Sequence, residues 1–124
     1  MLFRSVGQAA YFEFRVGPAN QQFQLRLPAP GVLRRDGFKP EFLIPKPVFT
    51  SRVEILPGRW RVHAEIPFAV IQETGRVQPG TQWRYSFCRY DYTRGAKTPV
   101  LSASSPHRKL DYHRVEEWRV LTFA

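Results

Sequence analysis

Apolar and polar residues alternate along most of this chain, which is the pattern of β-strands with distinct faces. In residues 9–16, AAYFEFRV, Phe12 and Phe14 alternate with Glu13. Residues 22–27, QFQLRL, alternate in the same way, and Gly, Pro and Asn occur in the short stretch between the two segments. Two alternating segments joined by turn-forming residues predict a β-hairpin.

A second hairpin is predicted over residues 48–56 and 59–66, which are joined by a Pro-Gly turn. In its second strand, Trp60 and Val62 alternate with polar residues such as Arg61, so one face of this hairpin is apolar and the other is polar. We expect the apolar face to turn inward.

The remaining chain is less regular. Residues 28–47 contain five prolines and predict a long connection with at most one short strand. Pro67 suits the first turn of a short helix, because its missing N–H would be unpaired there. Residues 83–92 predict the most aromatic strand, residues 93–109 an irregular loop, and residues 118–123 a closing strand.

The composition is that of one folded domain spanning residues 1–124. The chain is 43% hydrophobic and 15% aromatic, which is enough to form a single core. No stretch approaches the roughly 18 apolar residues of a membrane-spanning helix, and the start lacks the pattern of a signal peptide. We therefore expect an all-β, antiparallel, hairpin-rich domain of about six or seven strands, a sandwich or a barrel.

The net charge of +9 raises the question of an anionic partner. The basic residues are mostly arginines and are scattered, and no block of five or more occurs. Several alternate with apolar residues along predicted strands, which indicates an ordinary solvated face and makes nucleic-acid binding unlikely.

Cys88 is the only cysteine, so no intrachain disulfide can form, and it is interpreted as a small filler in a strand.

Five segments follow one another in an order that is typical of a known family. They are YFEFRVGPAN (11–20), WRVHAEIPF (60–68), GTQWRYSFCRY (80–90), SASSP (102–106) and DYHRVEEWRVLTF (111–123). This series resembles the family 9 carbohydrate-binding-module-like (DOMON-like) domains. The resemblance implies an antiparallel β-sandwich of immunoglobulin- or jelly-roll-like type with one short helical turn, and a non-catalytic carbohydrate-binding function.

The chain departs from the family in three respects. Trp118-Arg119 stands near the place where the family often has Gly, in the last turn before the closing strand. Ser86 stands where the family usually has Asn before the Phe of the Trp-containing strand. The strands with which family members usually begin have no counterpart here, so the resemblance implies a sandwich lacking early strands. Such a sandwich would expose a sheet edge, and we expect marginal stability or self-association through that edge.

The tryptophans are the candidate sugar-binding platforms, because the C–H faces of sugars stack on aromatic rings while hydroxyl groups need polar partners. Trp83, Trp60 and Trp118 are candidates for stacking, with Arg89 and Gln82 as polar partners. The alternative for each tryptophan is a place in the core. The alternative for Arg89 is a structural ion pair with a glutamate such as Glu13, Glu54 or Glu65.

The other polar residues point to structure. In the resemblance, His113 and Arg114 belong to the turn before the last strand, and we interpret His113 as fixing that turn. The spacing of His63, His107 and His113 matches no metal motif, so we predict no metal and no cofactor. Enzyme signatures such as GxSxG and GxxxxGK[ST] are absent, which favours a non-catalytic protein.

Two other functions stay open from the sequence. One is a structural or protein-interaction module in which the sugar site has been lost, since a fold does not determine a function. The other is binding of an anionic polymer or nucleic acid through the arginine-rich faces, which would weaken steeply with salt.

Overall fold

The computed structural model describes all residues from 1 to 124 and confirms the predicted all-β, antiparallel, sandwich-like fold. The strands are β1 (Leu2–Ser5), β2 (Tyr11–Val16), β3 (Gln22–Leu27), β4 (Thr50–Leu56), β5 (Arg59–Glu65), β6 (Gln82–Ser86), β7 (Cys88–Asp91), β8 (Val100–Ala103) and β9 (Arg119–Thr122). The helical elements are short: α1 (Val32–Asp36), η1 (Pro40–Phe42), α2 (Phe68–Ile71) and η2 (Val115–Glu117).

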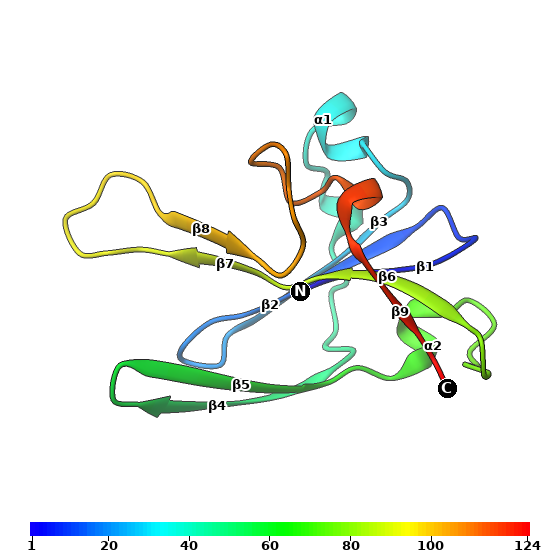
Figure 1. Ribbon diagram of the computed structural model, residues 1–124, viewed down its shortest axis with the longest axis horizontal. Helices are drawn as coiled ribbons and strands as arrows, with labels where there is room; N and C mark the ends of the chain where they lie inside the picture. Colours follow the sequence, from blue (N-terminus) through cyan, green and yellow to red (C-terminus); the bar gives the residue numbers. More distant parts are fainter.

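A five-stranded sheet in the order β3-β2-β1-β6-β9 is the central layer, and β4-β5 and β7-β8 are separate hairpins. Figure 1 shows α1 and η2 on one side of this sheet, and the β4-β5 hairpin and α2 on the other. Each face therefore has its own core. Tyr11, Leu27 and Trp118 belong to the first core, whereas Phe14 and Trp83 belong to the second.

Strand β2 is buried on both faces. Tyr11 and Phe14, which lie on opposite faces, have no exposed surface, and Glu13, on the same face as Tyr11, is only 7% exposed. The alternation in the sequence correctly separated the two faces of this strand. It did not show that both faces are covered, because a period of two only says which residues lie together.

The second hairpin forms as predicted. β4 pairs antiparallel with β5 from Thr50 opposite Glu65 to Leu56 opposite Arg59. Gly58 lies between the strands with φ 68°, a left-handed conformation that glycine adopts without steric cost. The short helix after Pro67 is also confirmed, as α2.

The sheet has an exposed edge, but it does not lie at the start of the chain. β1 lies inside the sheet, where Phe3 is the register partner of Phe12 in β2 and of Tyr85 in β6. The exposed edge is β9, one of the two edge strands of the sheet, and all four of its residues are exposed. The edge of β3 is partly covered, because Ile44 N donates to Gln24 O.

Two other segments differ from expectation. Residues 28–47 contain α1 and η1 rather than a strand, and only an isolated bridge joins Leu25 to Leu43. The predicted strand 83–92 breaks at Phe87 into β6 and β7, and the predicted loop 93–109 contains β8, which pairs with β7. β7 leaves the line of β6 because it pairs with β8 and not with a strand of the central sheet.

Candidate functional site: a cleft between three hairpins

Two of the predicted sugar platforms are core residues. Trp83 is 4% exposed and Trp118 is 3% exposed, so neither indole offers a free face for stacking. The indole N–H groups are satisfied internally: Trp83 Nε1 donates to Gln72 Oε1 (2.9 Å), and Trp118 Nε1 donates to the carbonyl oxygen of Tyr112 (2.8 Å). The core alternative therefore applies to both tryptophans.

The other predicted site residues are more accessible. Trp60 is half-buried, and Arg89 is half-exposed and pairs with Asp91 (3.0 Å) rather than with a glutamate. Both line the same cleft. Gln82 lies outside this cleft, on the exposed side of β6, where its Nε2 donates to Thr122 Oγ1 (3.3 Å).

The cleft lies where three hairpins separate. Figure 1 shows β2-β3, β4-β5 and β7-β8 extending from the region of the N-terminus toward the same side. The cleft has a volume of about 790 Å³, which is within the range of roughly 300–1,000 Å³ that is typical of ligand sites. It is lined by Met1, Leu2, Glu13, Phe14, Arg15, Val16, Gly17, Pro18, Trp60, Val62, Ala64, Phe87, Cys88, Arg89, Tyr90, Asp91, Tyr92, Tyr112 and His113.

Aromatic side chains form much of the accessible wall of the cleft. Phe87 and Tyr90 are each about half exposed, and Tyr92 is 72% exposed. Trp60 approaches from β5 on another wall. These aromatic side chains are exposed together beside a concave surface and are not part of the core. They provide flat surfaces against which a ligand can stack.

Charged groups in the cleft are largely paired with one another. Arg15 Nε donates to Glu13 Oε1 and its guanidinium lies over the Phe23 ring (5.3 Å), while Arg89 pairs with Asp91. The second carboxylate oxygen of Glu13 is buried and has no hydrogen-bond partner.

His113 approaches Glu13 from the C-terminal turn. Its Nε2 atom lies 3.7 Å from Glu13 Oε2, and its Nδ1 atom lies 3.0 Å from the Tyr11 hydroxyl. Burial lowers the pKa of His113, and the nearby carboxylates of Glu13 and Asp111 only partly oppose this effect. Burial also raises the pKa of Tyr11, so both groups are neutral near pH 7.

The turn that contains His113 and Arg114 is held by local polar contacts. The backbone N–H of His113 donates to Asp111 Oδ1 (3.0 Å), and Arg114 pairs with Glu116 and Glu117 (both 3.2 Å). Hydrogen bonding to Arg114 lowers the pKa of Glu117. These contacts position the His113 ring at the wall of the cleft.

A second polar cluster escaped the sequence analysis because its members are far apart along the chain. Glu117 Oε2 lies 3.4 Å from His107 Nδ1, and His107 Nε2 lies 3.5 Å from Ser86 Oγ. The order acid–imidazole–hydroxyl is that of a nucleophile-activating triad. Ser86, however, has no exposed surface, so no substrate can reach its hydroxyl in this structure.

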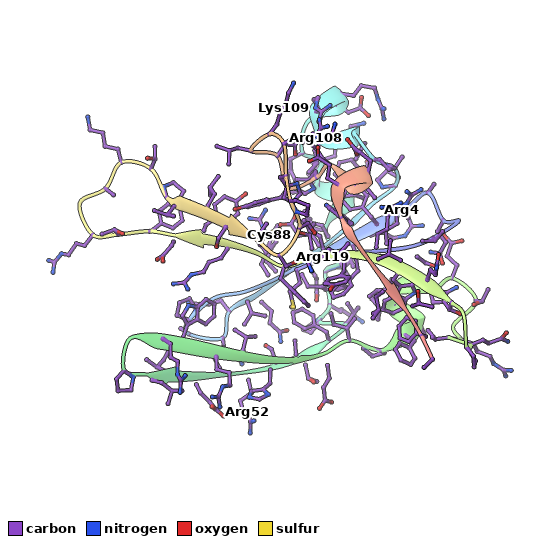
Figure 2. The ribbon with its side chains drawn as sticks, viewed as in Figure 1. Arg4, Arg52, Cys88, Arg108, Lys109 and Arg119 are labelled. Carbon is purple, nitrogen blue, oxygen red and sulfur yellow. The ribbon has the colours of Figure 1, made fainter.

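Basic residues do not gather into one patch. Figure 2 labels Arg108 near the top of the view, Arg52 near the bottom, Arg4 toward the right and Arg119 near the centre. Many arginines also pair with acidic neighbours, namely Arg15, Arg26, Arg34, Arg35, Arg52, Arg61, Arg89 and Arg114.

No group of three or more His, Cys, Asp or Glu side chains is arranged to hold a metal ion. No helix has the length and apolar character required to span a bilayer.

In comparisons with known proteins, no family model, no curated protein and no solved structure matches this chain.

Proposed function

We propose that this protein is a non-catalytic carbohydrate-binding module of the family 9-like type, with its ligand in the cleft between the three hairpins. The observation that carries the proposal is the shared position of Trp60, Tyr90 and Tyr92, which expose aromatic surface on the walls of one cleft. This site differs from the one expected from the sequence, since Trp83 and Trp118 are in the core.

The chemistry of the cleft suits a polyhydroxylated ligand. The C–H face of a sugar ring can lie against an aromatic ring, and its hydroxyl groups can pair with planar charged groups at the edge. Arg89 and Asp91 stand beside the aromatic groups and supply donors and acceptors. Because the two side chains already neutralise each other, an uncharged sugar is favoured over an acidic one.

The test is isothermal titration calorimetry of the protein with neutral oligosaccharides of glucose and of xylose. Trp60→Ala should abolish the heat of binding, because it removes the stacking surface on β5. Arg61→Ala is the matched control: Arg61 is the next residue on the same strand, lies on the opposite face and contacts Glu54 outside the cleft. This control should bind like the wild type.

Two results would overturn the proposal. One is the absence of saturable binding to any of these sugars by a folded sample. The other is binding that survives Trp60→Ala, because the ligand would then lie outside the cleft. Retention on heparin that falls steeply with salt would instead favour the alternative of an anionic-polymer-binding protein.

A further inference from the structure

The cleft interrupts the hydrogen-bonding ladder of the central sheet. Phe14 exchanges two backbone hydrogen bonds with Met1 (both 2.8 Å), and these are the last bonds that β2 makes on this side. On its other side, β2 stays paired with β3 as far as Val16 opposite Gln22. Backbone groups alternate between the two edges of a strand, so the N–H and C=O of Val16 point into the cleft.

The same alternation applies to β7 on the opposite wall. Val6 N donates to Gln82 O, so even-numbered residues of β6 face β1. Ser104 N donates to Phe87 O, so odd-numbered residues of β7 face β8. The backbone groups of Cys88 and Tyr90 therefore point toward the line along which β1 would continue, which is the cleft.

We propose that the cleft is a strand-acceptor site for an extended peptide segment of another protein. The segment would lie between β2 and β7 in line with β1, and hydrogen-bond to Val16 on one side and to Cys88 and Tyr90 on the other. Peptide recognition by strand addition obtains its affinity from such main-chain bonds. This inference does not depend on the proposed carbohydrate function, although a peptide and a sugar would compete for the space.

The walls of the cleft indicate which types of side chain an inserted peptide should carry. One side of the inserted strand would face β5, where Trp60, Val62 and Ala64 form an apolar surface. The other side would face the polar wall of Glu13 and His113. An inserted segment should therefore alternate apolar and polar residues. A neutral segment is favoured, because Arg15 pairs with Glu13 and Arg89 pairs with Asp91 in the walls of the cleft.

The strands of a second copy of this chain do not fit the site. An inserted strand needs two free edges, one for β2 and one for β7. Every strand of the chain already pairs along at least one edge with a neighbour in its own sheet or hairpin. The occupant must therefore be a segment that is unpaired before it binds.

The test uses a short synthetic peptide of alternating Thr and Val, and NMR hydrogen exchange of the full chain. A matched peptide with Pro at the central position cannot complete the ladder. At a concentration roughly tenfold above its Kd, the Thr-Val peptide should slow exchange of the Val16, Cys88 and Tyr90 amides roughly tenfold by mass action. The Pro peptide should leave these amides unchanged.

A second experiment does not depend on the affinity of the free peptide. In it, the same Thr-Val segment is fused directly before Met1. The β1 register then places it in the cleft at high effective concentration. Protection of the same three amides, with a higher Tm than the Pro-containing fusion, supports the proposal. Unchanged exchange at these amides in the fused protein, or protection confined to Val120 on the β9 edge, overturns it.

Discussion

The hydroxyl of Tyr11 lies 3.0 Å from Nδ1 of His113, and this contact joins β2 to the turn that precedes the last strand. The opposite ring nitrogen of His113 faces Glu13 Oε2 at 3.7 Å. A neutral imidazole protonated on Nε2 suits both neighbours, because it accepts from Tyr11 and directs its N–H at the carboxylate. His113 thus fastens the C-terminal turn to the first core while forming part of the cleft wall.

Tyr11→Phe should destabilise the fold by about 1–2 kcal/mol, because it removes the hydroxyl and leaves a buried His113 nitrogen without its partner. Equilibrium urea unfolding followed by circular dichroism measures this change. Tyr92→Phe is the matched control, since Tyr92 is 72% exposed and should tolerate the change within about 0.5 kcal/mol. Equal stability of the two variants would mean that the Tyr11–His113 contact contributes nothing.

Stability should fall as the pH drops below about 6.5, the usual pKa of histidine. Burial lowers the pKa of His113 in the folded state, so between that pKa and 6.5 the unfolded chain binds a proton that the folded chain does not. The free energy of unfolding therefore rises with pH across this window. Urea unfolding at a series of pH values measures the slope.

His113→Gln should flatten this slope, because glutamine does not titrate. The charged groups that face His113 are Glu13, Asp111, Arg15 and the Met1 amine, and they stay in place. The pKa of Asp111 is lowered, because its bonds to Arg34 and the His113 amide outweigh the effect of its burial. Protonation of Asp111 therefore destabilises the fold only in more acidic solution, around and below pH 4. An unchanged slope above pH 5 would assign the effect to another group.

Trp83→Ala and Trp60→Ala should behave differently although both remove an indole. Trp83 packs in the second core, with the Phe123 ring 5.0 Å away, and its loss should cost about 3–5 kcal/mol of stability. Trp60 belongs to neither core cluster, so its loss should cost much less. Thermal unfolding of both variants tests this contrast, and a similar Tm for both would contradict the assignment of Trp83 to the core.

The β9 edge should support weak self-association that grows with salt, because salt screens the repulsion between chains of charge +9. Phe123 N donates to Thr81 O, so alternation directs the N–H of Val120 away from β6. Val120→Pro removes this free donor without touching a β6 bond, and should abolish the association. Sedimentation velocity at several concentrations measures it, and association unchanged in Val120→Pro would exclude the β9 edge.

The candidate site was predicted only in part. Trp60 and Arg89 were proposed from the sequence, and both line the cleft. Tyr90 and Tyr92 were not proposed, because their exposure depends on the break at Phe87, which separates β7 from β6. Nor did the sequence place His113 beside Glu13, since the two lie near opposite ends of the chain and meet only through packing of the C-terminal turn.

The pattern of side chains was sufficient to predict the local elements: the strands of both large hairpins, the Pro-Gly turn at Gly58 and the two faces of β2. These follow from side-chain alternation and backbone sterics, which act over a few residues. Packing between distant segments sets which faces are covered, makes Trp83 a core residue while Trp60 lines a cleft, and places β1 between β2 and β6. Burial depends on neighbours distant along the chain, and alternation does not specify those neighbours.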